Sequence, residues 1–174
     1  MPPVTRRQII QTGAAGSALL ALASCARSNA PFTDGGNRYR VLTAGDRELI
    51  AAVAGAMLTG VLPGDATQRQ DALVRTVRGA DVVIAGLPPR VIDELRQLLA
   101  LLEFPPTRGF VAGIWTAWPQ TASETVARFL TRWRYSGSAL QRSGYQALHQ
   151  VVMAAWYGNA SSWSRIGYPG PPQP

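Results

Sequence analysis

The chain has 174 residues, of which 47% are hydrophobic and 16% are charged, with 17 basic residues against 10 acidic ones. This composition is typical of a single globular domain and excludes a disordered chain. Every basic residue is an arginine, and the arginines occur without runs, so no nucleic-acid-binding stripe is indicated. One cysteine, Cys25, and one histidine, His149, exclude an intramolecular disulfide, a cysteine-cluster metal site and a multi-histidine metal site.

The N-terminus is typical of an export signal. Arg6 and Arg7 stand directly before a weakly apolar stretch, residues 9–23, which is diluted by glycine and is shorter than a membrane-spanning helix requires. The combination predicts that residues 1–24 are a twin-arginine signal peptide. We therefore expect a periplasmic protein that is recognised by the twin-arginine translocase.

Two processing sites overlap at the end of this signal. Ala21-Leu22-Ala23 fits ordinary cleavage between small residues, whereas Leu22-Ala23-Ser24-Cys25 resembles a lipoprotein box. Because the chain has a single cysteine and it stands where that box needs it, we favour lipidation of Cys25. Acyl chains on Cys25 would attach the protein to the membrane without a spanning helix.

Residues 25–42 are rich in Ser, Asn, Pro, Asp and Gly and predict a flexible tether. Thr43 followed by Asp46 is typical of a helix start, in which the threonine caps the helix and the acid completes a capping box. Apolar residues then recur at helical spacing as far as Val61, so a first helix is expected over 44–61. Pro63-Gly64 ends it.

Four further helices are expected. Thr67 or Asp65 caps the second, which counts Val82 among its apolar positions and ends at residues 86–89. The third spans 89–103 with Val91 in its apolar stripe, and Pro105-Pro106 ends it. No prediction is made for 107–122. Ser123 caps a fourth helix that closes at 135–137, and the last helix runs over 138–157. The sequence thus predicts an all-α bundle of about five helices over residues 43–158.

Residues 159–174 contain repeated Gly and Pro, which predicts an extended C-terminal tail without further helix. Trp163 and Tyr168 are expected to be aromatic anchors on it. Such rings fit a groove on a partner protein, and the alternative is a tail that folds back on its own helical core.

No catalytic set is found in the sequence. His149 and Met153 are four residues apart and could ligate a haem or soft metal, but packing of both is the simpler interpretation. Asp93, Glu94 and Glu103 are interpreted as a solvated helix face, and Arg132-Trp133-Arg134 as a surface cation–π pair. We therefore expect a chain that is not an enzyme and that binds no metal or cofactor itself. Because the twin-arginine route carries folded cargo, a second chain is expected to be exported with this one.

The C-terminal third resembles the gluconate 2-dehydrogenase subunit 3 family. The similarity lies in Ala155-Trp156-Tyr157-Gly158-Asn159, in Trp163 and in the run from Ile166 to Pro171. Thr43, Asp46 and Pro63 are similar to the start and end of the family's first helix, and together with the signal the resemblance covers about half the chain.

The resemblance implies a non-catalytic small subunit of a periplasmic dehydrogenase complex. The catalytic partner would be a glucose–methanol–choline-type flavoprotein that carries FAD, with a cytochrome c subunit as a further candidate partner. The small subunit would supply the export signal and assist maturation, and lipidation of Cys25 would make it the membrane anchor. The residues expected to contact the flavoprotein are Trp156, Tyr157, Asn159, Trp163, Ile166, Gly167, Tyr168, Pro169 and Gly170. The alternative is a free-standing periplasmic helical lipoprotein with a ligand-binding or envelope-structural role.

Overall fold

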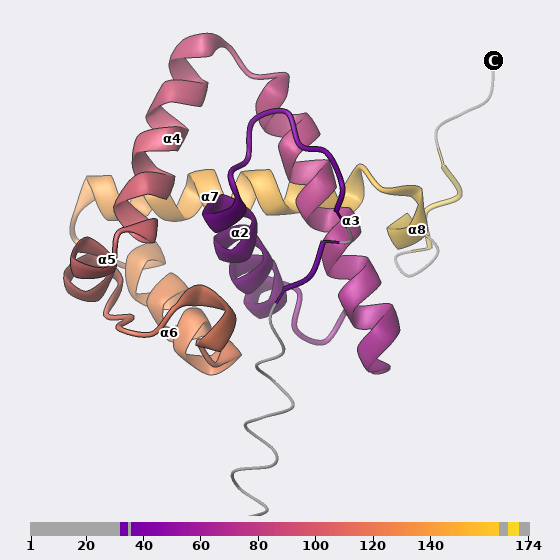
Figure 1. Ribbon diagram of the computed structural model, residues 1–174, viewed down its shortest axis with the longest axis horizontal. Coiled ribbons are helices and arrows are strands. Elements are labelled where there is room, and N and C mark those ends of the chain that lie inside the picture. Colours follow the sequence, from indigo (N-terminus) through magenta and orange to yellow (C-terminus); the bar gives the residue numbers. More distant parts are fainter. Residues whose placement is uncertain (1–31, 35, 164–166, 171–174) are drawn as a thin grey trace, which may run out of the picture. The chain divides into compact units, whose positions relative to one another are not determined.

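The structure is a computed structural model that describes residues 32–34, 36–163 and 167–170. These residues form seven α-helices and one 3-10 turn, and no strand occurs among them, which confirms the all-α prediction (Figure 1). The predicted signal with Arg6 and Arg7, the candidate lipidation site Cys25, and Ile166 of the tail lie outside the described residues.

Helix α2 (Ala44–Met57) lies at the centre of the bundle and packs against α3, α4, α6 and α7. It begins at the predicted capping box: the Asp46 amide donates to Thr43 Oγ1 at 3.2 Å, and the Thr43 amide donates to Asp46 Oδ2 at 2.8 Å. Leu49, Ile50 and Val53 are fully buried. The helix ends at Met57, four residues before the predicted end, so Val61 lies outside it and is exposed.

Helix α3 (Ala66–Ala85) and the long helix α7 (Ala139–Tyr157) cross each other in the most extensive helix contact of the domain. Asp65 is the N-cap of α3 and accepts from the Gln68 amide at 2.9 Å, and Gly86 is its C-cap, as predicted. Val82 was expected in the core, but its side chain is 58% exposed. It lies instead in the lining of an open groove beside the crossing of α3 and α7.

Two consecutive prolines separate α4 (Pro89–Glu103), predicted at these bounds, from α5 (Pro105–Ala112), which was not predicted. Pro105 and Pro106 lack an N–H, so they cannot continue the hydrogen bonds of α4. Both fit the first positions of a new helix, where no such bond is needed. The same two residues therefore end one helix and begin the next. Val91, expected in the stripe of α4, is exposed instead.

The turn η1 (Trp118–Gln120) leads into α6 (Ser123–Arg134). The residue that caps α6 is Ala122, without a side-chain bond, so the prediction of a Ser123 cap is wrong. An aromatic cluster fills the core here: the Phe129 ring lies 4.8 Å from that of Trp133 and 6.2 Å from that of Trp118. Trp133 was expected in a surface cation–π pair, but it is fully buried.

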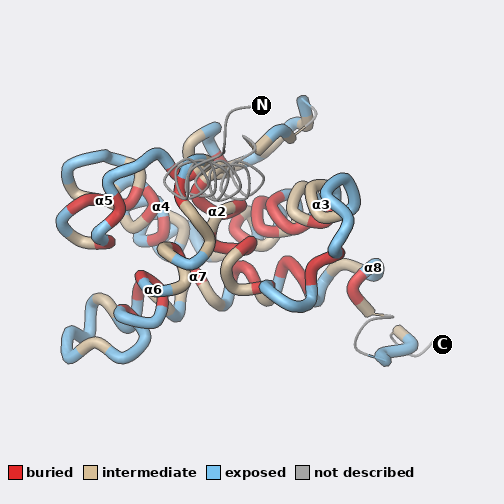
Figure 2. The backbone as a smooth tube through the Cα atoms, turned by 90° about the horizontal axis from the view of Figure 1, so that it is seen from below, coloured by how far each residue is buried: buried red, intermediate tan, exposed pale blue. Residues whose placement is uncertain are grey.

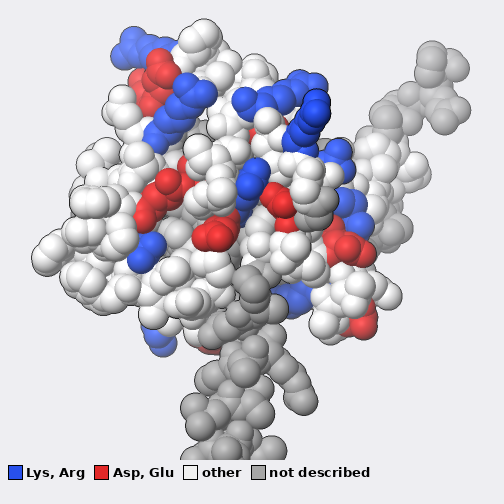
Figure 3. All heavy atoms as spheres, viewed as in Figure 1, with Lys and Arg blue, Asp and Glu red and all other residues white. Residues whose placement is uncertain are grey.

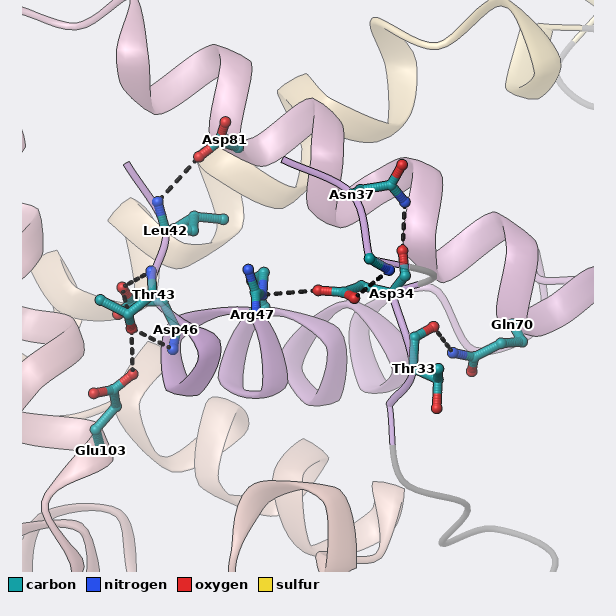
Figure 4. A network of polar contacts seen from close by, with 11 residues as sticks. Thr33, Asp34, Asn37, Leu42, Thr43, Asp46, Arg47, Gln70, Asp81 and Glu103 are labelled. Carbon is teal, nitrogen blue, oxygen red and sulfur yellow. Dashed lines mark hydrogen bonds and ion pairs between the residues drawn. The ribbon is translucent and has the colours of Figure 1, made fainter. Parts of the chain in front are cut away.

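The segment before α2 is not a free tether where the structure describes it. Residues 32–34 and 36–42, called the strap below, run along α2 and α3 (Figures 1 and 4). The buried Asp81 carboxylate of α3 accepts three backbone N–H groups of the strap, from Arg40, Val41 and Leu42, at 2.8, 2.9 and 3.0 Å. The strap is therefore part of the folded domain, which corrects the prediction of flexibility up to residue 42.

Two further contacts fix the strap. Arg47 of α2 forms an ion pair with Asp34 at 3.0 Å and lies 4.6 Å over the ring of Tyr39, and Gln70 of α3 donates to the carbonyl of Thr33. Burial on its own would raise the pKa of Asp81, but the three backbone donors outweigh it and hold that pKa below its ordinary value.

Among the described residues, no helix is long and apolar enough to cross a membrane.

Candidate partner-binding site

An open groove of about 480 Å³ lies where α3 meets the end of α7. Its walls come from three elements: the middle of α3, the last turn of α7, and the start of the short helix α8 (Ala160–Trp163). The lining residues named in the argument below are Arg75, Arg78, Val82, Val83, Ala155 and Asn159.

The floor of the groove exists because small residues let the two helices approach each other. A Cβ on Gly79 would lie 3.0 Å from the Ala155 carbonyl oxygen and 3.2 Å from the Ala155 Cα and Cβ atoms. Any larger residue at position 79 would push α3 and α7 apart. The close crossing leaves the flanking side chains of α3 standing at the rim.

The rim on α3 is positively charged. Arg75 and Arg78 are exposed, and neither forms an ion pair with a carboxylate in the described part of the chain. Beside them Val82 presents apolar surface to solvent. Sequence analysis missed the two arginines of this wall because it traced only the apolar positions of α3, and it placed Val82 in the core. The signal was present, since residues 75, 78 and 82 share one face at helical spacing.

The opposite wall is built by the turn between α7 and α8. Asn159 Oδ1 accepts from the Ser161 amide at 3.0 Å, and the buried Ser162 hydroxyl lies 2.7 Å from the carbonyl oxygens of both Trp156 and Asn159. These bonds satisfy carbonyls at the end of α7. The prediction that no helix follows residue 158 is therefore wrong for Ala160–Trp163.

Beyond α8 the tail folds around the ring of Trp163. The Trp163 indole N–H donates to the Tyr157 carbonyl at 2.7 Å, and the Tyr168 amide donates to the Trp163 carbonyl at 3.0 Å. The two rings meet edge to face at 5.4 Å. Gly167 and Gly170 adopt positive φ, and a Cβ on Gly170 would lie 3.2 Å from the Trp163 ring. Trp163 and Tyr168 are thus one unit, attached to the end of α7.

The residues predicted to contact a partner fall into two groups. Trp156 is 6% exposed and belongs to this chain's own core, so its ring is not available to a partner and that expectation is wrong. Tyr157 and Tyr168, by contrast, are 49% and 44% exposed. Asn159 lies in the groove wall, Trp163 is half-buried, and Gly167, Pro169 and Gly170 follow in the described part of the tail.

A second polar cluster lies at the start of α2. Glu103, expected on a solvated face, lies beside Asp46, and its Oε1 atom is 3.3 Å from Thr43 Oγ1 (Figure 4). Burial, followed by the neighbouring Asp46 carboxylate, raises the pKa of Glu103. Gly45 leaves room for it, since a Cβ there would lie 2.4 Å from Glu103 Oε1. This pair lies where the start of α2 meets the end of α4.

His149 and Met153, the candidate ligands of a haem or soft metal, each pack against neighbouring side chains of the domain. His149 lies against the Tyr145 ring, with centroids 5.6 Å apart, and Met153 packs against the core. Within the described ranges no three His, Cys, Asp or Glu side chains could hold a metal ion. Comparison of the chain with protein-family models, with curated proteins and with solved structures finds no match. The resemblance stated above therefore depends on the residues quoted for it.

Proposed function

We propose that this chain is the non-catalytic small subunit of a periplasmic flavin-dependent dehydrogenase complex of the glucose–methanol–choline type. In that role it supplies the twin-arginine signal through Arg6 and Arg7 and assists maturation of an FAD-bearing catalytic subunit. Lipidation of Cys25 would anchor the complex in the membrane. The resemblance of the tail supports the kind of partner, and the groove supports the way in which a partner is held.

One observation carries the proposal: Asn159 of the motif that resembles the family lines a groove whose two arginines form no ion pair within the described residues. Tyr, Trp and Arg are the residue types that contribute most to protein–protein binding. Tyr157 at the end of α7 and Tyr168 in the tail offer large exposed rings, and Arg75 and Arg78 line the groove. These residues suit a partner segment whose carboxylates would pair with the two arginines and whose apolar side chain would pack against the floor of the groove.

The test is purification of the complex from the membranes of the native host. The full chain carries an affinity tag after Gln173, and the eluate is examined by absorbance spectrum and gel. A flavin spectrum with a large co-purifying band is the expected result. A colourless eluate with a single band would contradict the proposal.

A charge reversal then locates the interface. Arg75→Glu with Arg78→Glu should lower recovery of the large band by 10-fold or more, because the groove would repel acidic residues of the partner. The matched control is Arg90→Glu with Arg96→Glu on the exposed face of α4, which reverses the same charge elsewhere. Equal loss in both variants would show a general effect of charge and not binding at the groove.

The alternative function is that of a free-standing periplasmic lipoprotein that binds a small ligand. The size of the groove favours it, since 480 Å³ lies within the range of ligand pockets, and two arginines suit an anionic amphiphile. A monomeric protein that elutes alone from host membranes and retains an anionic amphiphile in its mass spectrum is the outcome expected for this function.

A further inference from the structure

Three aromatic side chains protrude from α5 and its flanking residues. Phe110 is 82% exposed, Trp115 is 67% exposed and Phe104 is 59% exposed, although most large apolar side chains of the domain are buried. The rings of Phe110 and Trp115 meet edge to face at 5.5 Å. Exposed apolar groups gathered in this way mark a binding surface more often than isolated ones do.

The segment that carries the protruding rings is held in place by backbone packing and hydrogen bonds. A Cβ on Gly109 would lie 2.4 Å from the Trp115 ring, so the indole lies directly on the backbone of α5. The buried Arg108 donates to the carbonyls of Ile114 and Glu103, at 3.2 and 3.4 Å, and Arg132 of α6 donates to the Ala112 carbonyl. The surface is therefore presented in a fixed shape.

The charge of the chain is concentrated in the same part of the sequence. Residues 25–103 carry nine arginines and nine acidic residues, whereas residues 104–174 carry six arginines and a single acid, Glu124. Every ion pair that the described residues form lies between Asp34 and Arg96. The arginines of α6 and α7 thus have no carboxylate partner in the described part of the chain.

The end of α6 lies against the end of α5, because Arg132 donates to the Ala112 carbonyl and the Trp133 indole donates to the Val111 carbonyl. In two perpendicular views, α5, the end of α6 and the start of α7 lie at one end of the helical domain (Figures 1 and 2). Exposed Tyr135 and Leu140 lie at the turn between α6 and α7, and Arg134 lies 5.2 Å over the Tyr135 ring. Charges of both signs cover α2, α3 and α4 in Figure 3, while the side towards α5 is largely uncharged.

We propose that this end of the domain docks on an anionic phospholipid bilayer. The aromatic end, as we call it, consists of Phe104, Phe110, Trp115, Tyr135 and Leu140 with the arginines at 128, 132, 134 and 142. The aromatic side chains enter the interface between headgroups and acyl chains, where Trp and Tyr are favoured. The arginines bind the lipid phosphates, and a single acid in 71 residues leaves little to oppose them.

The composition of the surface favours a bilayer over a folded protein as the occupant. Phe110 and Trp115 protrude as one edge-to-face pair with exposed arginines in the same part of the chain, and a fluid layer of lipid closes around such a pair without a matching pocket. A protein partner would need a preformed pocket for each ring and carboxylates for the arginines. The docking is independent of the accessory-subunit role, because the groove on α3 and the aromatic end involve different residues.

The first experiment reports on the aromatic end alone. In the full chain with Cys25→Ser, a single cysteine is introduced as Phe110→Cys and labelled with an environment-sensitive fluorophore. Vesicles with 30% phosphatidylglycerol should shift its emission to the blue, and vesicles of phosphatidylcholine alone should shift it less. The matched control is a label at Val91→Cys, an exposed valine on α4, which should not shift.

An unshifted label at position 110, or equal shifts at both positions, would overturn the proposal. A shift at position 110 that requires the co-purified dehydrogenase in place of vesicles would show that the aromatic end contacts protein, which also overturns it. Loss of flavoprotein co-purification with a normal vesicle shift would instead contradict only the proposed function. The two proposals therefore fail separately.

The second experiment measures partitioning to the same anionic vesicles by sedimentation. Phe110→Ser with Trp115→Ser should lower the partition coefficient of the full chain by about 10-fold or more, because two interfacial anchors are lost. Arg128→Gln with Arg134→Gln should lower it several-fold on anionic vesicles and little on neutral ones. Arg90→Gln with Arg96→Gln is the control for charge, and an equal decrease there would contradict a localised contact.

Discussion

The two halves of the domain differ in the side chains that hydrogen-bond to their backbone groups. From residue 32 to residue 103, carboxylates accept hydrogen bonds from backbone N–H groups: Asp81 from the strap, Asp46 at the start of α2 and Asp65 at the start of α3. From residue 104 onward, arginines and tryptophans donate to backbone carbonyls. In the first half, acidic side chains accept from N–H groups that have no partner within a helix. In the second half, side-chain donors bond to carbonyls that have no partner within a helix.

The two prolines between the halves leave two carbonyls of α4 without backbone donors. In a continuous helix, the N–H groups of residues 105 and 106 would bond to the carbonyls of Leu101 and Leu102, but both residues are proline. The Thr107 hydroxyl donates to the Leu101 carbonyl instead, and the Trp118 indole N–H donates to the Leu102 carbonyl at 3.0 Å. Side chains from later in the chain thus replace the missing backbone donors.

The comparison shows that a charge imbalance can have a structural origin as well as a functional one. Arg108 and Arg132 of the second half bind carbonyls at the ends of α4 and α5, and Arg142 binds the Ser136 carbonyl after α6. Arg128, by contrast, bonds only to the Thr125 hydroxyl on its own helix. Substitutions that remove one acceptor or one donor separate the two halves experimentally.

The largest effect is expected at the carboxylate that holds the strap. Asp81→Ala leaves three backbone N–H groups without their acceptor, and we expect a loss of about 3 kcal/mol in the free energy of unfolding of the full chain. Urea denaturation measures it. Asp71→Ala, at an exposed position on the same helix, is the control and should change stability by less than about 0.5 kcal/mol.

The same substitution has a defined pH dependence. Because the pKa of Asp81 is lowered in the fold, its contribution is complete above the ordinary pKa of an aspartate and is lost as the pH falls through the lowered value. The difference between the wild type and Asp81→Ala should therefore shrink below about pH 4. A difference that stays constant down to pH 2 would contradict the assignment to the ionised carboxylate.

A smaller effect is expected from the second half. Trp118→Phe keeps a buried aromatic ring but removes the donor to the Leu102 carbonyl, which should cost about 1–2 kcal/mol. Trp115→Phe removes an indole N–H from an exposed ring and should cost less than about 0.5 kcal/mol in the same urea titration. Equal losses would show that ring size matters here and that the hydrogen bond does not.

The smallest effect concerns the carboxyl pair of Glu103 and Asp46, both in the first half. Because the pKa of Glu103 is raised in the fold, its contribution to stability falls as the pH rises from the ordinary glutamate value through the raised one. Glu103→Gln should therefore gain stability relative to the wild type between pH 4 and pH 7, by less than about 1 kcal/mol after screening by solvent.

Thermal unfolding at several pH values measures this gain. Glu94→Gln on the exposed face of the same helix removes an equal charge and corrects for the general effect of a more basic chain. A relative gain that is the same for both variants, or one that decreases with pH, would contradict the pairing of Glu103 with Asp46.

Local signals in the sequence were sufficient for the helices of the first half. The capping box of Thr43 and Asp46, the cap at Asp65 and the proline at position 89 each act within a few residues, so α2, α3 and α4 begin where predicted. Tyr157 and Tyr168 are exposed, and their contact with a partner remains a prediction.

The parts that were missed depend on contacts between distant residues. Nothing near Arg40, Val41 or Leu42 in the sequence indicates that their N–H groups bind Asp81 of α3. The short helix α5 has a Pro-Pro start that is equally typical of a helix end. Trp156 was assigned to a partner because of its motif, although its spacing from Val152 placed it on the buried stripe of α7.

The attachment of the strap also imposes an order on folding. Its three N–H groups bond to an aspartate that lies 39 to 41 residues further along the chain. During synthesis the strap leaves the ribosome before α3 exists, so its amides remain bonded to water until that helix has been made and positioned. Docking of the strap is therefore a late event, which can occur only after α3 has formed.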